Sequence, residues 1–117
     1  MASTSERDID LLAKIAMAEA ESQTELGKRL VIDTVLNRVD SDEFPDTVEK
    51  VIFQKGQFAP IIDGRWEQCY VKDDIRELVI EELENRTNSD VMFFRTKRYS
   101  KYGTPLFKED DHYFSSN

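Results

Sequence analysis

The chain has 117 residues, which is enough for one domain with a single modest core and too few for two. Hydrophobic residues make up 39 % of it and charged residues 34 %, a composition typical of a globular protein rather than a disordered one. The net charge of −8 argues against nucleic acid and anionic membrane surfaces as partners, and any anionic substrate would have to be met at short range or through another module.

Residue counts exclude several further kinds of site. One His and one Cys cannot form a usual zinc site, and a lone Cys69 allows no intramolecular disulfide. There is no Gly-rich phosphate loop, and no apolar run approaches the ~20 residues that span a bilayer. Residues 1–6 lack the basic and apolar regions of a secretion signal, so we expect a protein made without one or an excised domain.

The first predicted helix, from about residue 6 to 22, carries a carboxylate on its apolar face. At 100° per residue, Glu19 falls about 20° from Leu12 in the middle of the apolar stripe, whereas Glu21 points about 180° away. A buried carboxylate must be paired, hydrogen-bonded or protonated with a raised pKa. Glu19 is therefore either a structural residue bonded to a core Arg, Tyr or amide, or a general acid for glycosidic cleavage.

A second helix is predicted from about residue 24 to 39. Apolar residues surround much of its circumference, so it should be the buried central helix. Its polar members Thr34 and Asn37 could line a cleft, although satisfaction by nearby backbone is the commoner arrangement for such residues. A short helix follows from Pro45 to about Phe53.

Residues 57–66 contain an Asp-Gly turn signal and are predicted to form a small hairpin or an ordered loop. Phe58 and Trp66 in this segment are either carbohydrate-stacking platforms or anchors to the core. A further helix begins at Asp74, where a capping pattern stands, and ends within residues 85–88.

The C-terminal part is predicted to form a short antiparallel sheet. Val91–Arg95 has strand character, 103–105 is a turn, and 112–114 is expected to pair with the first strand as an edge strand. The basic cluster between them is interpreted as a solvated loop: Arg95, Lys97, Arg98 and Lys101. The predicted fold class is α+β, mainly helical. His112, the only His, is expected to be structural or substrate-facing, because no Ser stands in a nucleophile-elbow pattern that would give it a partner for a Ser/His/Asp relay.

Several motifs follow one another along the chain: Met17-Ala18-Glu19-Ala20, Val35-Leu36-Asn37-Arg38-Val39, Phe44-Pro45-Asp46-Thr47-Val48, Val51-Ile52, Gly56-Gln57-Phe58-Ala59-Pro60, Asp90-Val91-Met92-Phe93-Phe94 and His112-Tyr113-Phe114. In this order they resemble the SleB/CwlJ-like cell wall hydrolases, the family of spore-cortex-lytic enzymes, and the resemblance spans roughly residues 9–114. The chain departs from the family pattern at Glu21, where a small residue is usual, and at Asp110-Asp111, where Gly-Asn precedes the His.

The resemblance implies a small lysozyme-like domain over residues 1–117 that cleaves peptidoglycan between N-acetylmuramic acid and N-acetylglucosamine. Family members act as lytic transglycosylases with one Glu in the first helix, which matches Glu19. We expect five residues to contact the sugar: Gln57, Phe58, Phe94, Tyr113 and Thr34. We expect a monomer acting on the bacterial cell wall or spore cortex, with no metal, cofactor, nucleic acid or membrane partner.

Two alternatives remain open at the level of sequence. A hydrolytic muramidase of the same fold would need a second carboxylate, for which Asp33, Asp63 and Glu67 are candidates. A non-catalytic module that binds glycan or assists assembly could retain the same fold. The products released from purified peptidoglycan distinguish all three.

Overall fold

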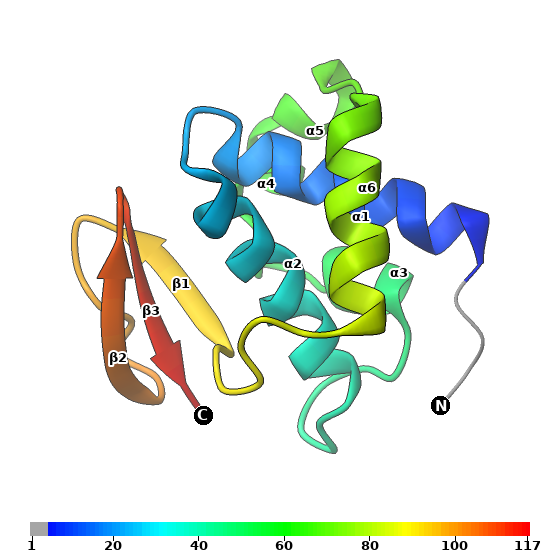
Figure 1. Ribbon diagram of the computed structural model, residues 1–117. Coiled ribbons are helices and arrows are strands. Elements are labelled where there is room, and N and C mark those ends of the chain that lie inside the picture. Colours follow the sequence, from blue (N-terminus) through cyan, green and yellow to red (C-terminus); the bar gives the residue numbers. More distant parts are fainter. Residues whose placement is uncertain (1–4) are drawn as a thin grey trace.

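The computed structural model describes residues 5–117, and it packs a helical part against a small sheet (Figure 1). Residues 1–4, part of the segment without a secretion-signal pattern, lie outside the described residues. In chain order the elements are α1 (Glu6–Ala20), α2 (Glu25–Val39), α3 (Val48–Ile52), α4 (Ala59–Asp63), α5 (Arg65–Gln68), α6 (Asp73–Glu84), β1 (Phe93–Thr96), β2 (Thr104–Glu109) and β3 (His112–Ser116). The predicted class, mainly helical with a short antiparallel sheet, is confirmed.

Helices α1 and α2 begin at side-chain caps that the sequence supplies. The Ser5 hydroxyl accepts the Asp8 N–H at 3.1 Å, and the Thr24 hydroxyl accepts the Gly27 N–H at 3.0 Å. The apolar stripe of α1 is fully buried against α2, α3 and α6, as the spacing predicted. The predicted bounds of both helices are confirmed to within two residues.

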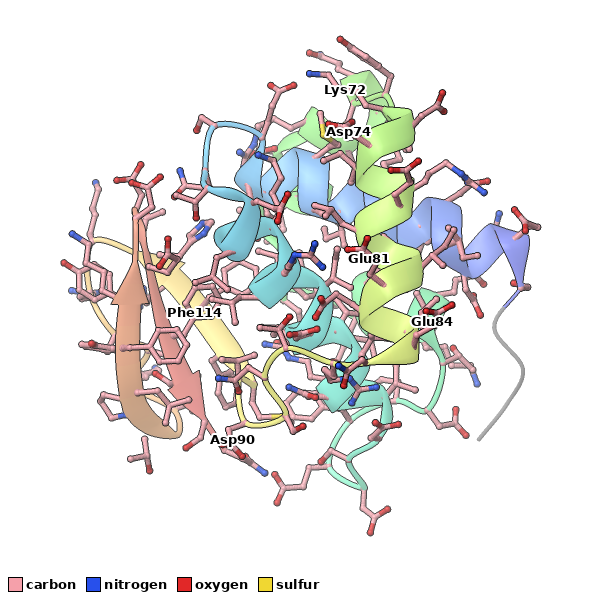
Figure 2. The ribbon with its side chains drawn as sticks, viewed as in Figure 1. Lys72, Asp74, Glu81, Glu84, Asp90 and Phe114 are labelled. Atoms are coloured by element: carbon pink, nitrogen blue, oxygen red, sulfur yellow. The ribbon has the colours of Figure 1, made fainter. Side chains whose placement is uncertain are left out.

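Helix α2 is the central helix, lying between the sheet on one side and α1 with α6 on the other (Figure 1). Phe114 of β3 packs on Leu30 of α2, in the space between the sheet and the helices (Figure 2). Thr34 is fully buried, and its hydroxyl donates to the Leu30 carbonyl at 2.8 Å. The expectation that Thr34 lines a cleft is therefore wrong, because local backbone satisfies its hydroxyl.

The sheet has the antiparallel order β1-β3-β2, with β3 in the centre. The prediction of residues 112–114 as an edge strand is wrong, because β2, which begins within the predicted turn at 103–105 and continues to residue 109, pairs with the other side of β3. Strand β2 is largely exposed and begins with Thr104-Pro105, so it shows none of the apolar alternation that reveals a strand. A proline is tolerated there because an edge strand has one unpaired side.

Residues 57–66 do not form the predicted hairpin or loop but the two short helices α4 and α5. Gly64, with φ of 85°, is the left-handed residue between them, so the Asp-Gly signal marks a helix end instead of a hairpin turn. Helix α3 is likewise shorter than predicted, because Thr47 rather than Pro45 opens it.

A buried carboxyl pair joins α2 to α6. Asp33 accepts the Asn88 N–H at 3.0 Å and shares a hydrogen bond with Glu82, which also accepts the Arg29 guanidinium at 2.9 Å. Burial, followed by the hydrogen bond with Glu82, raises the pKa of Asp33. Burial alone would raise the pKa of Glu82 too, but the hydrogen bonds from Asp33, Thr87 and Arg29 hold it below its ordinary value. Asp33 is therefore the member of the pair that holds a proton.

The raised pKa of Asp33 makes stability depend on pH in a defined direction. A folded pKa above the unfolded one stabilises the fold at low pH, and this contribution is lost as pH rises through the folded pKa. Asp33→Asn keeps an acceptor for the Asn88 N–H and a donor for Glu82 but removes the titration. We expect urea unfolding at about pH 9 to give the variant a free energy of unfolding that is higher than that of the wild type by about 1 kcal/mol or more. At about pH 5 the difference should be smaller. A difference in the free energy of unfolding between the two proteins that does not change with pH would contradict this prediction.

Phe58 is a core residue, only 2 % exposed, with its ring against Phe94 at a centroid distance of 6.0 Å. Phe58→Ala should lower the free energy of unfolding by about 3–5 kcal/mol, because it empties a packed site. Phe53→Ala, at a ring that is 42 % exposed, is the matched control and should cost much less. Loss of turnover with unchanged urea unfolding would instead show that Phe58 contacts the substrate directly.

Candidate active site

A cavity of about 700 Å³ lies between the end of α1, the α3–α5 segment and strand β1. It brings together one carboxylic acid, several cations and a set of aromatic rings. Its lining residues are Glu19, Arg38, Phe44, Gly56, Gln57, Ala59, Ile62, Arg65, Phe93, Phe94, Arg95, Thr96, Ser100, Tyr102 and His112.

Glu19 stands in the last turn of α1, where the apolar stripe of the helix reaches the cavity. Its side chain is 11 % exposed, and the guanidinium of Arg65 lies 4.0 Å from its Oε1. Burial raises the pKa of Glu19 to about 7, while Arg65 opposes the rise and Asp63 adds to it. A carboxyl group in this environment can hold a proton at neutral pH and give it up in a reaction.

Arg65 is fixed by Asp63 at the junction of α4 and α5. Its Nε donates to Asp63 Oδ2 at 2.9 Å, and its backbone N–H donates to Oδ1 at 3.0 Å. These bonds hold the pKa of Asp63 below its ordinary value, so Asp63 is an anion engaged with Arg65. The pair places a cation beside Glu19 without placing a second free carboxylate there.

Arg38 forms the back of the cavity. It is 3 % exposed, and its guanidinium lies 4.8 Å from the Phe44 ring centroid and 5.2 Å from the Phe58 and Phe93 centroids. It donates to the Met92 carbonyl at 2.8 Å and so ties α2 to the start of the sheet.

Of the five expected sugar-contacting residues, Gln57 and Phe94 line the cavity. The Gln57 side-chain oxygen accepts from Arg38 at 3.1 Å, and the half-buried Phe94 ring packs edge-on against His112 with centroids 5.1 Å apart. His112 lines the cavity as well, and burial lowers its pKa, so its imidazole is neutral. The remaining three residues lie elsewhere.

Thr34 and Phe58 are buried in the core, as described above, and Tyr113 faces away from the cavity. Side chains alternate along a strand, so Tyr113 points to the opposite face from its neighbours His112 and Phe114, which face the helices. Tyr113 lines a separate shallow cavity of about 320 Å³ on the outer face of the sheet. The expectation that Tyr113 contacts the sugar together with Gln57 and Phe94 is therefore wrong for this cavity.

Sequence reasoning missed the cationic part of the site. Arg38 lies within a motif already quoted, and Arg65 directly follows the Asp-Gly pair, but neither position signals a cavity until the chain is folded. Of the three candidates for a second carboxylate, Asp33 is buried between α2 and α6, Glu67 does not line the cavity and Asp63 is bound to Arg65.

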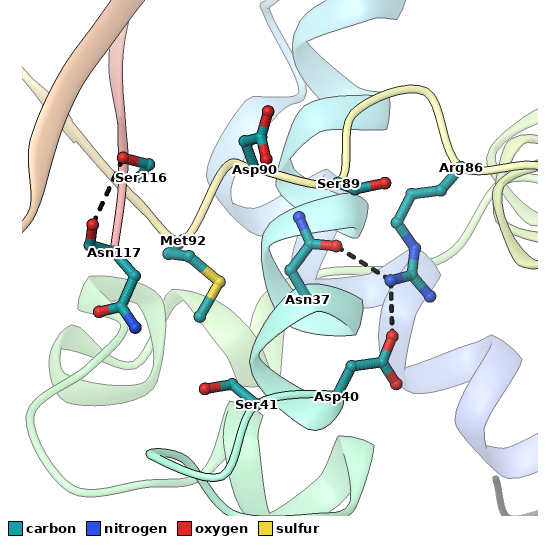
Figure 3. Close-up of a pocket in the computed structure, with 9 residues that line it drawn as sticks. All are labelled: Asn37, Asp40, Ser41, Arg86, Ser89, Asp90, Met92, Ser116 and Asn117. Atoms are coloured by element: carbon teal, nitrogen blue, oxygen red, sulfur yellow. Dashed lines mark hydrogen bonds and ion pairs between the residues drawn. The ribbon is translucent and has the colours of Figure 1, made fainter.

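A second cavity, of about 570 Å³, lies on another part of the surface, where the end of α2 meets the segment after α6 (Figure 3). Arg86 is its central group, and it already donates to Asn37 at 2.9 Å and to Asp40 at 2.7 Å. Both bonds come from Nη1, and Nε has no partner among the described residues. The carboxylates that line this cavity, Asp40 and Asp90, are exposed, so it offers no buried proton donor comparable to Glu19. Across residues 5–117 there is no cluster of three or more His, Cys, Asp or Glu placed to hold a metal ion, and none of the helices is long and apolar enough to span a membrane.

Comparison with curated proteins finds similar sequences among cell wall enzymes. A spore cortex-lytic enzyme of Halalkalibacterium halodurans is 34 % identical over 87 residues, which are 73 % of this chain and 26 % of the relative. A spore cortex-lytic enzyme of Oceanobacillus iheyensis is 36 % identical over 80 residues, 68 % of this chain and 28 % of the relative. The chain thus spans about a quarter of the length of these relatives.

Solved structures share the fold at lower sequence identity. The catalytic domain of the Bacillus cereus SleB protein superposes with a TM-score of 0.85 at 24 % identity, covering 99 % of this chain and 94 % of that one. The catalytic domain of the germination-specific lytic transglycosylase SleB from Bacillus anthracis gives a TM-score of 0.82, also at 24 % identity, covering 99 % of both chains.

A family model described as Cell Wall Hydrolase matches residues 22–115. The match contains most of the cavity lining and begins just after Glu19, so the role of Glu19 depends on its geometry. The chain belongs to the cell wall hydrolase family.

Proposed function

We propose that this chain cleaves the glycan strand of peptidoglycan, in the bacterial cell wall or spore cortex, between N-acetylmuramic acid and N-acetylglucosamine. In this proposal it acts as a monomeric lytic transglycosylase with Glu19 as the only catalytic acid and base. The observation that carries the proposal is that Glu19, with its pKa raised to about 7, is the only carboxyl group among the described residues that line the cavity. Family membership and the names of the relatives support the substrate class.

The reaction needs one group that first donates and then accepts a proton. Protonated Glu19 gives its proton to the glycosidic oxygen, and the bond from this oxygen to C1 of the muramic acid breaks through an oxocarbenium-like transition state. The Glu19 carboxylate then takes the proton of the muramic C6 hydroxyl, whose oxygen bonds to C1 and closes a 1,6-anhydro ring. Glu19 ends protonated, and no water is consumed.

Arg65 can stabilise the charged form of Glu19 that exists between these two steps. Glu19 is negatively charged after it donates its proton, and a guanidinium 4.0 Å away stabilises this anion. Because Asp63 holds Arg65, the cation is in position before the reaction begins. Burial and Arg65 act on the pKa of Glu19 in opposite directions, which leaves it suited to both donating and accepting near neutral pH.

Mass analysis of the fragments released from purified peptidoglycan tests the reaction type. We expect 1,6-anhydro-muramic ends, because an inverting or retaining hydrolase uses a second carboxylate and none lines the cavity among the described residues. Reducing muramic ends would identify a hydrolase, in which Asp63 would have to leave Arg65. Absence of any released fragment would identify a glycan-binding module.

Glu19→Gln should lower fragment release by at least ~10²-fold, because glutamine keeps the size of the side chain but cannot donate a proton. Glu21→Gln, two residues away on the exposed side of α1, is the matched control and should retain wild-type activity. Urea unfolding of both variants should show that the fold is retained. An active Glu19→Gln protein would remove Glu19 from the mechanism.

The pH dependence follows from the protonated state that starts the reaction. Turnover should be high below about pH 7 and should fall as pH rises through the pKa of Glu19. Arg65→Gln removes the charge that lowers this pKa, so the falling limb of its profile should shift to higher pH even though its maximal rate is lower. If turnover falls over the same pH range in the wild type and in Arg65→Gln, a group other than Glu19 sets the pH dependence.

A further inference from the structure

The face of the sheet turned away from the helices carries basic and aromatic side chains side by side. Arg95 of β1 and Lys108 of β2 both pair in register with Tyr113 of β3, so the three form one row across the strands. Lys97 lies beside this row in the shallow cavity of about 320 Å³, and Tyr99 packs edge-on against Tyr113 with centroids 5.0 Å apart. We call these five residues the outer sheet face.

The charge of the molecule is divided unevenly between its two parts. Residues 93–117 contain five basic and three acidic side chains, a formal charge of +2, whereas residues 1–92 carry −10. Of the three acids, Glu109 accepts the Thr24 hydroxyl at 2.7 Å, and Asp111, which also lines the shallow cavity, accepts the Gln23 amide at 3.1 Å. Lys97 and Lys108 therefore outnumber the one carboxylate in the lining of that cavity.

The cations of the outer sheet face form no ion pair with carboxylates of the described residues. Over residues 5–117, every ion pair involves an arginine that precedes the sheet: Arg7, Arg29, Arg65, Arg76 and Arg86. Lys108 instead lies 5.2 Å from the centroid of the Tyr113 ring, and the Arg95, Lys97 and Lys108 side chains are exposed. A half-buried ring beside exposed ammonium groups offers apolar area and charge to the same ligand.

We propose that the outer sheet face is a second contact for peptidoglycan, separate from the Glu19 cavity. Lys97 and Lys108 bind carboxylates of the stem peptides, and Tyr113 packs against the adjoining sugar. The proposal rests on the proposed substrate, which is an anionic polymer that a chain of charge −8 repels at long range.

The two surfaces are continuous around the edge strand β1. Thr96 lines both the Glu19 cavity and the shallow cavity, and Arg95 lines the first while pairing in register with Tyr113 beside the second. A glycan strand held in the Glu19 cavity therefore brings its peptides, or a neighbouring strand of the wall, to the outer sheet face. Binding there keeps the enzyme on an insoluble substrate between cleavage events.

Co-sedimentation with purified sacculi tests this second contact. The protein carries Glu19→Gln so that binding is measured without cleavage, and the sacculi are freed of phosphate-containing polymers. Lys97→Asn with Lys108→Gln should weaken binding about tenfold and flatten its salt dependence, since each exposed ion pair contributes up to about fivefold. Asn is chosen at Lys97 because this residue has φ of 75°.

The matched control is Lys50→Gln with Lys72→Gln, which removes the same charge from exposed positions in the helical part. It should bind as the parent does. Equal weakening of binding in both double variants would mean that only the net charge of the protein matters. Unchanged binding in Lys97→Asn/Lys108→Gln would mean that the outer sheet face does not take part in binding. Binding only to sacculi that retain phosphate polymers would also overturn the assignment to peptidoglycan.

A soluble short glycan separates this inference from the proposed function. With Glu19 intact, Lys97→Asn/Lys108→Gln should cleave such a glycan within about twofold of the wild type, because neither lysine lines the Glu19 cavity. A large loss on the short glycan would assign the lysines to the cavity and overturn the second contact. If Glu19→Gln itself still cleaves, the catalytic proposal fails, whereas the second contact is still judged by whether the lysine variant and its matched control, in the same background, differ in sedimentation.

Discussion

The burial of one carboxyl group at the end of α1 is the constraint on which the site depends. Glu19 continues the apolar stripe that packs α1 into the core, so helical periodicity holds it out of solvent. An ionised carboxylate would be costly there, and the pKa rises instead. The protein tolerates this because Arg65 stands beside the group and the cavity opens on one side. The same packing that forms the helix therefore produces the raised pKa on which the proposed role of Glu19 depends.

Arg38 is a second buried charged group, and it holds the wall of the cavity together. A buried cation without a carboxylate partner is costly unless its N–H groups and its charge are satisfied in other ways. Its guanidinium lies among three aromatic rings and donates to the Met92 carbonyl and to Gln57, so one side chain joins α2, the start of the sheet and the cavity lining. The hydrogen bond from Arg38 thus links the exposed Gln57 side chain to the packing of the central helix.

The sequence predicted the elements with strong periodicity and missed those without it. The wheel position of Glu19 marked it as buried before any fold was known, and α1, α2 and α6 follow from their apolar stripes. Strand β2 was not predicted because its residues are mostly exposed, and α4 and α5 were not because an Asp-Gly pair suits a hairpin as well as a helix end. Arg65 was missed for that same reason. Tyr113 was assigned to the wrong face although the alternation of His112 and Phe114 already predicts where it points.

The division of charge between the two parts of the molecule bears on how it meets an anionic polymer. The helical part carries an excess of carboxylates, which repels such a polymer, whereas residues 93–117 carry a formal charge of +2. A molecule with this asymmetry is oriented as it approaches, because only the sheet side is attracted within a Debye length of about 8 Å. The attracted side is the one that includes Arg95 and Thr96 at the mouth of the Glu19 cavity. Net charge alone would predict weak association with such a polymer, whereas in the proposed second contact the five basic residues of 93–117 let the side with the Glu19 cavity approach first.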